Sequence, residues 1–269
     1  MRDWQRIRLA RTDITDYVIH FTKHRSLCDT KWPDRGPAFA DAEQVFLEIL
    51  GNGFIRPTFA PIKSKTAGTT SNTVRGPHPA VCLTEQPLSA VLATRRYAGT
   101  RYSGFGIAYH KCALFHAGGR PVLYGSKPVL GKPIKRNEPG YEEGKDICTG
   151  GLPADLQYLR VRYDPTVGDS GKYPIDFTWE REWRVKCTGR GLPVYLDQYS
   201  GVFNPNTPIC ALVVEKDDQV RKACGFLQDK AARGVPWAAK LTCIVSLETV
   251  ATMLGAGDER YARIETWPE

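Results

Sequence analysis

The sequence predicts an α+β fold, because strand-like and helix-like segments follow one another without the regular alternation of parallel-sheet proteins. At 269 residues, the chain is long enough to bury a full hydrophobic core. Its 42% hydrophobic and 25% charged residues are ordinary for a soluble globular protein, and it contains no internal repeat. We therefore expect one domain over residues 1–269.

Runs of apolar, β-branched and aromatic residues predict the strands. In the first run, residues 17–22, successive side chains point to opposite faces, so His20 and Thr22 could project together into a cleft. A histidine at a strand end is equally typical of a structural hydrogen bond. A Gly-Gly pair at residues 118–119 indicates that the strands on either side of it form a hairpin. The other predicted strands cover residues 80–85, 104–110, 120–124, 208–214 and 240–245.

The clearest predicted helix covers residues 41–53. Asp41 can cap its first turn with Gln44 reaching back, and Gly51 or Gly53 can adopt the left-handed conformation that ends it. Further helices are expected after Pro87, within residues 152–162, from Asp217 or Asp218 to about Ala232, and after Ser246.

The most informative segment covers residues 176–185, where aromatic and apolar residues alternate with charged ones at a period of two. As a strand, it would place Glu180, Glu182 and Arg184 on one face and the aromatic residues on the other. The long run at 125–174 before it is rich in Gly, Pro and charge, as functional loops often are. Cross-strand ion pairs on a solvated face explain the same pattern, so a structural role stays open.

A second candidate position is the end of the predicted strand at 80–85. Thr84 and Glu85 lie there, just before a helix that begins after Pro87. Residues at such a corner are held by both elements, which suits a binding site better than the middle of a loop.

Metal sites and disulfides are not expected. His20, His24 and Cys28 recur at intervals of four, which would align three ligands only on a helix, and this segment opens as a strand. The eight cysteines include no C-x-x-C pair, and several lie in apolar runs where cysteine behaves as a small hydrophobe. We expect reduced thiols and a cytoplasmic protein.

The charge of the chain bears on its partners. A net charge of +8 and a pI of about 9.1 favour polyanions such as nucleic acid. The N-terminus is polar, and no apolar run reaches the length of a signal sequence or a membrane span. We therefore expect neither secretion nor a membrane partner.

Four motifs together resemble a known family. They are His20-Phe21-Thr22, the corner at 81–87, the strand at 104–109 and the segment from Glu180 to Arg184. In this order they look like the AbiGi group of abortive-infection (phage-resistance) proteins, which in turn resembles the DarT-like branch of the ADP-ribosyltransferase superfamily. The similarity covers roughly residues 17–185, and the strands and helices of residues 186–269 are expected to complete the core.

The resemblance implies a split, two-sheet core with peripheral helices that clasps NAD as cosubstrate. Nicotinamide would lie beneath His20 and Thr22, with Phe21 in the same cofactor-binding motif. Glu182 would stabilise the oxocarbenium-like ribose that forms when nicotinamide leaves. Glu180 would orient or deprotonate the acceptor.

The resemblance also suggests how the rest of NAD is held. Arg184 would pair with a phosphate or neutralise the carboxylates. Thr84, or equally Glu85, would support the catalytic carboxylate and the ribose. The candidates for a ring stacked on nicotinamide are Tyr97, which we prefer, Tyr102 and Tyr109.

Three functions remain open. The first is an NAD-dependent ADP-ribosyltransferase of toxin or phage-defence type, with nucleic acid slightly favoured over protein as acceptor by the charge, and a cognate antitoxin as a partner. The second is a non-catalytic nucleic-acid-binding or partner-binding module, the antitoxin-like half of such a system. The third, a nuclease with Mg²⁺ on Glu180 and Glu182, lacks a further acidic cluster in the sequence.

Overall fold

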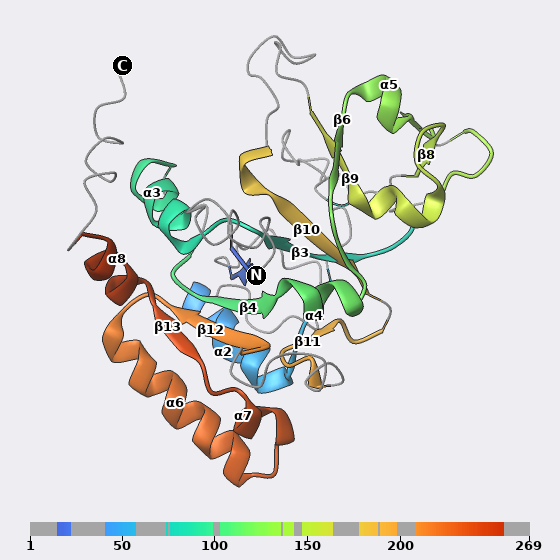
Figure 1. Ribbon diagram of the computed structural model, residues 1–269. Coiled ribbons are helices and arrows are strands. Elements are labelled where there is room, and N and C mark those ends of the chain that lie inside the picture. The colour runs from blue at the N-terminus through green and yellow to red at the C-terminus, as the bar shows by residue number, and fades with distance from the viewer. Residues whose placement is uncertain are drawn as a thin grey trace, which may run out of the picture. The chain divides into compact units, whose positions relative to one another are not determined.

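Helices and strands are mixed along the chain of the computed structural model, which confirms the α+β class (Figure 1). The structure describes residues 15–22, 41–57, 74, 76–98, 103–135, 137–142, 147–163, 178–187, 189–197 and 208–255. These residues form two compact units. Unit 1 is drawn from residues 1–53, 86–113 and 194–269, and unit 2 from residues 54–85 and 114–193.

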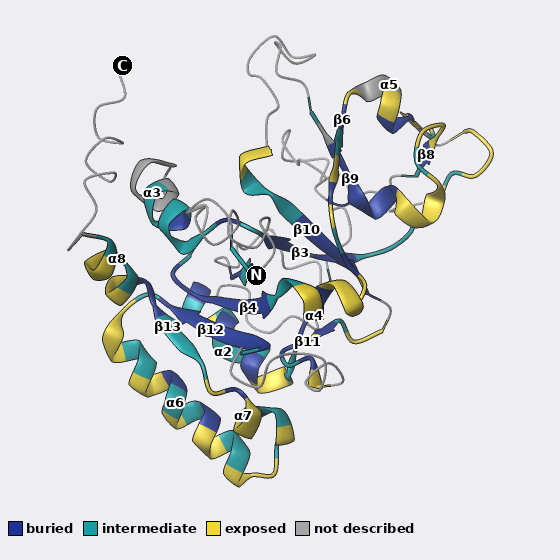
Figure 2. Cartoon of the chain, viewed as in Figure 1, coloured by how far each residue is buried: buried dark blue, intermediate teal, exposed yellow. Residues whose placement is uncertain are grey.

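Unit 1 contains four strands of a mixed sheet. Its strands lie in the order β13 (Ile244–Ser246), β12 (Cys210–Val214), β4 (Gly106–His110) and β1 (Tyr17–Phe21). β4 runs antiparallel to both of its neighbours, whereas β12 and β13 are parallel. Every residue of β12 is buried (Figure 2), as expected for an all-apolar run with a strand on each side.

The helices of unit 1 follow from local signals in the sequence. At the start of α2, Gln44 N–H donates to Asp41 Oδ1 over 2.8 Å and Asp41 N–H donates to Gln44 Oε1 over 2.9 Å, which is the predicted capping box. Gly53, at φ 78, ends this helix in the left-handed region as predicted. The helices of this unit are α2 (Ala42–Asn52), α3 (Leu88–Ala98), α6 (Asp217–Ala232), α7 (Pro236–Lys240) and α8 (Leu247–Gly255).

An apolar cluster joins the sheet of unit 1 to α3 and α8. Ile19 and Phe21 share one face of β1 and pack with Val91 of α3 and Leu247 of α8. α6 packs beside β12 and β13 (Figure 1). The core of this unit therefore forms where the alternating apolar residues of the strands meet one face of each helix.

Unit 2 contains three antiparallel strands of a sheet and three two-stranded ribbons. Of these three strands, β10 (Glu182–Lys186) lies between β3 (Ala80–Thr84) and β5 (Gly119–Pro121). The ribbons pair β2 (Phe54–Ile55) with β11 (Leu192–Pro193), β6 (Leu123–Gly125) with β9 (Arg160–Arg162), and β7 (Lys132–Pro133) with β8 (Cys148–Thr149). Its short helices are α5 (Lys127–Leu130) and the 3₁₀ helices η3 (Ala154–Leu159) and η4 (Thr178–Glu180), and α4 (Lys111–His116) contains residues of both units.

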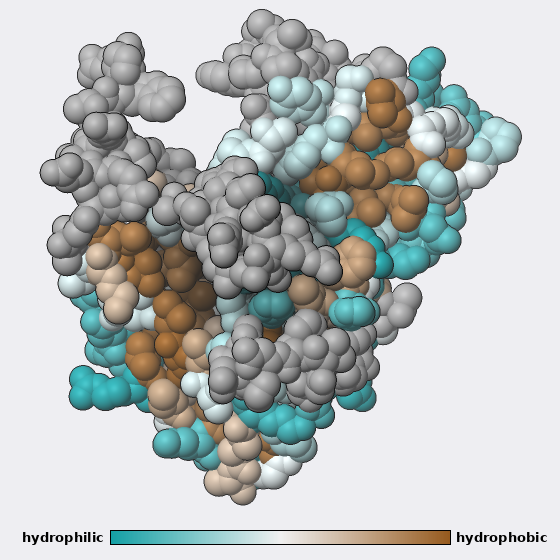
Figure 3. Space-filling model, viewed as in Figure 1, coloured by the Kyte–Doolittle hydropathy of each residue, from teal (hydrophilic) through white to brown (hydrophobic). Residues whose placement is uncertain are grey.

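Unit 2 leaves several large apolar side chains on its surface. Leu123, Val129 and Leu156 are between 42% and 65% exposed. Figure 3 shows hydrophobic side chains gathered over α5. None of the helices in the described part of the chain has the length and apolar character needed to cross a bilayer.

The strand predicted over residues 176–185 begins only at Glu182. Residues 176 and 177 lie outside the described ranges, and the next three form η4. The prediction that Glu180 shares a strand face with Glu182 is therefore wrong, because Arg181 has φ 44 and interrupts the extended backbone. Glu182 and Arg184 do share a face, since their side chains are hydrogen-bonded to each other.

The hairpin predicted around residues 118–119 is also wrong. β4 pairs with β1 and β12, and the segment at 120–124 is divided between β5 and β6. The reason is that α4 follows β4 directly. The glycine turn therefore leads from a helix into β5 rather than from one strand back onto its neighbour.

Three further boundaries differ from prediction. The helix expected within residues 152–162 is the 3₁₀ helix η3 followed by β9. The strand expected over 240–245 contains the end of α7 and most of β13. The N-cap of α6 is Lys216, and Asp217 and Asp218 lie in its first turn, where their charge favours the helix dipole.

Replacing Asp41 with alanine is expected to lower the free energy of unfolding by about 1 kcal/mol, because the amide of Gln44 loses its acceptor. Urea unfolding followed by circular dichroism measures the change. Asp41→Ser keeps an acceptor oxygen and should remain close to the wild type. Equal losses in the two variants would contradict the capping role.

Candidate functional site

A strained turn leads from η4 into β10. Arg181 has φ 44 and is the only non-glycine residue with a positive φ in the described part of the chain. This conformation costs an L-residue roughly 1–2 kcal/mol, so the surrounding contacts must hold it in place. Arg181 N–H donates to the carbonyl oxygen of Thr178 over 3.1 Å and closes the turn.

The corner after β3 holds this turn. The hydroxyl of Thr84 donates to the carbonyl oxygen of Glu180 over 2.5 Å, and Glu85 N–H donates to that of Arg181 over 3.0 Å. The side chain of Glu85 accepts a hydrogen bond of 2.6 Å from the indole N–H of Trp183. The structure thus brings the predicted corner residues against the predicted catalytic segment, and most of these contacts are made to its backbone.

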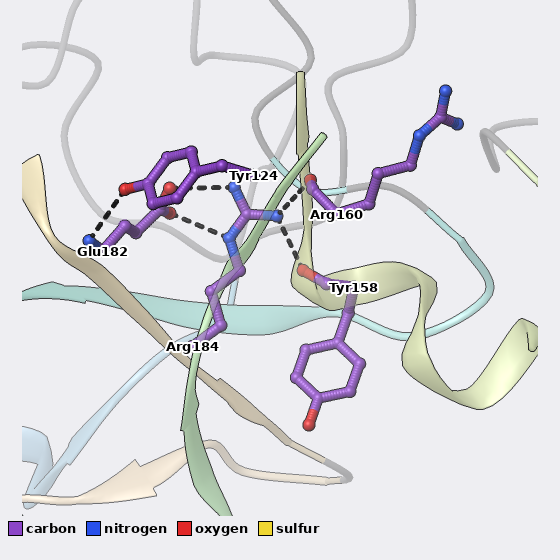
Figure 4. Close-up of polar contacts among 5 residues, drawn as sticks. All are labelled: Tyr124, Tyr158, Arg160, Glu182 and Arg184. Carbon is purple, nitrogen blue, oxygen red and sulfur yellow. Dashed lines mark hydrogen bonds and ion pairs between the residues drawn. The ribbon is translucent and has the colours of Figure 1, made fainter. Parts of the chain in front are cut away.

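The centre of the site is an ion pair between Glu182 and Arg184 (Figure 4). Arg184 Nε lies 2.8 Å from Glu182 Oε1, and Nη2 lies 3.1 Å from Oε2. The carboxylate side chain is 12% exposed and the guanidinium side chain 2%. Arg184 Nη1 donates to the carbonyl oxygens of Tyr158, over 2.6 Å, and Arg160, over 3.2 Å.

Arg184 remains a cation inside unit 2. Burial by itself lowers the pKa of its guanidinium, but the neighbouring Cys82 and Glu182 raise the pKa, and the net direction is upward. Cys82 lies directly opposite Arg184 in the ladder between β3 and β10. Because a buried charge is stable only with its partners, the Glu182 carboxylate is tied to the packing of the unit.

Tyr124 also contacts Glu182, and no pattern in the sequence predicted this contact. Its hydroxyl oxygen accepts a hydrogen bond of 3.1 Å from Glu182 N–H. The two residues are 58 positions apart, and Tyr124 lies in a run that predicted only a strand. No local pattern signals such a contact, because it joins a residue of β6 to a residue of β10 that is far away in the sequence.

The His20-Phe21-Thr22 motif lies at the end of β1 in unit 1. Phe21 belongs to the apolar cluster of this unit, and His20 is half-buried. Thr22 is 1% exposed. Its hydroxyl lies within hydrogen-bond distance of the carbonyl oxygens of Ala42, 2.8 Å away, and Phe105, 3.2 Å away. These contacts give Phe21 and Thr22 packing roles, and a role of the motif toward NAD stays a prediction.

The tyrosines considered for stacking differ in their surroundings. Tyr97 lies on α3, with its side chain outside the described part of the structure, and Tyr102 lies outside it altogether. Tyr109 is completely buried in β4, so its ring is not open to a ligand. His24 and Cys28 also fall outside the described residues.

The site therefore holds the Glu182 carboxylate in an ion pair, with Glu180 on the adjoining strained turn and Glu85 at the corner that supports this turn. A preorganised negative charge of this kind suits a reaction in which positive charge develops. Within the described ranges, no three His, Cys, Asp or Glu side chains form a group that could hold a metal ion. The chain matches no protein-family model, no curated protein and no solved structure.

Substitutions of Arg181 test the strained turn. Arg181→Gly is expected to leave the free energy of unfolding unchanged or to raise it by up to about 1 kcal/mol, because glycine adopts a positive φ without steric cost. Arg181→Val should lower it by about 1–2 kcal/mol, because a β-branched residue is poorly tolerated there. Urea unfolding gives both values, and a valine variant as stable as the glycine variant would contradict the turn.

A double-mutant cycle tests the ion pair. Glu182→Leu leaves Arg184 buried without its carboxylate, and Arg184→Met leaves that carboxylate without its cation. Each should lower the free energy of unfolding by about 3–5 kcal/mol. The double variant should recover part of the loss, since no unpaired charge remains. Asp229→Asn, which breaks an exposed pair with Arg233, should change stability little, and strictly additive losses at the buried pair would refute the coupling.

Proposed function

We propose that this chain is an NAD-dependent ADP-ribosyltransferase of toxin or phage-defence type, with Glu182 as the carboxylate beside the reacting ribose. The observation that carries the proposal is the fixed position of Glu182 at the start of β10, where both carboxylate oxygens contact Arg184. Glu180 lies two residues earlier on the strained turn. The order of the sequence motifs supports an AbiGi-type chain with a split, two-sheet, DarT-like core.

In the proposed reaction, the bond between ribose C1′ and the nicotinamide nitrogen breaks, and its electron pair leaves with nicotinamide. The ribose then resembles an oxocarbenium ion, which a fixed carboxylate stabilises. A lone pair of the acceptor forms the new bond to C1′, and the proton that the acceptor loses passes to Glu180 as general base. The His20-Phe21-Thr22 motif is taken as the nicotinamide-binding segment, as the resemblance implies.

The ion pair leaves Glu182 able to act in this reaction. An ionised carboxylate offers about four lone-pair positions, and Arg184 occupies one on each oxygen. The pair also prevents rotation of the carboxylate, so its orientation is set before the substrate binds. Preorganisation of this kind is a main source of electrostatic catalysis.

The charge of the chain supports a nucleic-acid acceptor. A net charge of +8 attracts a phosphate backbone at physiological salt, and it offers no similar general attraction to proteins. A toxin that modifies nucleic acid would also need a cognate antitoxin as a partner in the cell that produces it.

A second candidate function is a non-catalytic module that binds nucleic acid or a protein partner, as an antitoxin does. The observation that favours it is the burial of the ion pair, because Arg184 has as many contacts as a purely structural cation needs. In this case, Glu182 would be retained for stability, and its loss would affect folding rather than turnover.

The test is mass spectrometry of DNA, RNA and protein after incubation of the purified chain with NAD. We expect an added ADP-ribose and release of nicotinamide, with turnover in Glu182→Gln lowered by at least about 100-fold, as for loss of a transition-state-stabilising group. Thermal unfolding shows whether the variant is folded. If the glutamine variant is not folded, Glu182→Asp takes its place, because aspartate retains the negative charge but its side chain is shorter by one methylene group. Asp229→Asn serves as the control for loss of an ion pair elsewhere.

A folded Glu182→Gln variant with unchanged turnover would refute the role of Glu182. An intact wild-type chain that neither consumes NAD nor leaves an adduct in any pool would refute the enzyme and favour the binding module.

A further inference from the structure

The backbone N–H and the carbonyl group of Glu182 both form hydrogen bonds with one short segment, residues 122–124. Val122 N–H donates to the carbonyl oxygen of Glu182 over 2.9 Å, which extends the pairing of β5 with β10 by one residue. Glu182 N–H donates in turn to the hydroxyl oxygen of Tyr124 over 3.1 Å. In an antiparallel ladder, the N–H and the carbonyl group of a residue in a hydrogen-bonded pair both bond to the backbone of the residue opposite. Here a side-chain hydroxyl serves as the acceptor at the start of the strand.

The ribbon of β6 and β9 holds both halves of the ion pair. Tyr124 lies on β6, directly opposite Val161 of β9. Arg160, the first residue of β9, and Tyr158, near the end of η3 just before it, offer the two carbonyl oxygens that accept hydrogen bonds from Arg184. Figure 4 shows the ring of Tyr124 beside the Glu182 carboxylate, with both carbonyl groups on the far side of the guanidinium. The ribbon and the end of η3 together therefore set the position of the acid and of its cation.

We infer that Tyr124 is a positioning residue, which fixes the main chain of Glu182 and thereby the place of its carboxylate. This inference rests on the proposed function. Glu182 is the first residue of β10 and directly follows the strained Arg181. Hydrogen bonds to both its N–H and its carbonyl group are therefore needed to fix the start of the strand. A displacement of about 1 Å of a catalytic group can cost on the order of 100-fold in rate.

Tyr124 acts through the main chain, and its removal leaves no charge unpaired. Arg184 still contacts the carboxylate through the side chain, so Tyr124→Phe is expected to fold. The ring is kept and only the hydroxyl oxygen is lost. The amide of Glu182 then exchanges with solvent more freely, and the carboxylate samples positions away from the reacting ribose.

The experiment compares the full-length wild type with Tyr124→Phe in two independent readouts. The first is hydrogen exchange of the Glu182 amide, which we expect to be about tenfold faster in the variant. The second is steady-state release of nicotinamide from NAD. Here kcat should fall by about 10-fold to 100-fold while KM for NAD changes less than about twofold. Tyr141→Phe removes a hydroxyl of a half-buried tyrosine elsewhere in unit 2 and should change neither readout.

The outcomes separate this inference from the proposed function. Unchanged exchange of the Glu182 amide, or a raised KM with a normal kcat, overturns the positioning role. Faster exchange with no NAD turnover even in the wild type supports the contact and overturns the enzyme. Should Tyr124→Phe fail to fold, the wild type still decides, because a Glu182 amide without protection from exchange overturns the hydrogen bond to Tyr124.

Discussion

The buried guanidinium of Arg184 is the constraint on which the organisation of unit 2 depends. A cation whose side chain is only 2% exposed would destabilise the fold by several kcal/mol without partners, so the chain must bring acceptors to it. The acceptors come from one carboxylate on the same strand and two carbonyl groups at the end of η3 and the start of β9. β10 is therefore packed against η3 and β9 by a polar requirement.

A second set of contacts explains why the backbone before Glu182 can be strained. The conformation of Arg181 is unfavourable by itself, yet the corner at Thr84 and Glu85 bonds to the carbonyl groups on both sides of the turn. Strain held in this way is common at functional sites, where it presents a group in one orientation. Here the strained turn places Glu182 at the start of β10, with its carboxylate oriented by Arg184. A site that is rigid before binding is what electrostatic stabilisation of a developing charge requires.

The accuracy of the sequence predictions follows the range of the interactions involved. The helix at 41–53 was predicted with both ends, because its capping box and its terminal glycine act within a few residues. The hairpin around residues 118–119 was wrongly predicted, since a helix in the connection outweighed the turn signal of two glycines. The single strand at 176–185 failed for a related reason. Its alternating pattern was real, but hydrogen bonds to Thr84 and Glu85, almost 100 positions away, favour a turn there.

The sequence by itself determined the α+β class and the buried strand β12, and it singled out Glu182, Thr84 and Glu85 as separate candidate site residues. Periodicity and residue chemistry are enough for such conclusions, because each depends on the residues themselves and on their immediate surroundings. The tertiary structure alone decided that Arg184 is buried and paired, that Arg181 is strained and that Tyr124 holds the amide of Glu182. These features depend on which distant strands pack together, and that choice is made by the summed burial and hydrogen bonding of a whole unit, which no short pattern contains.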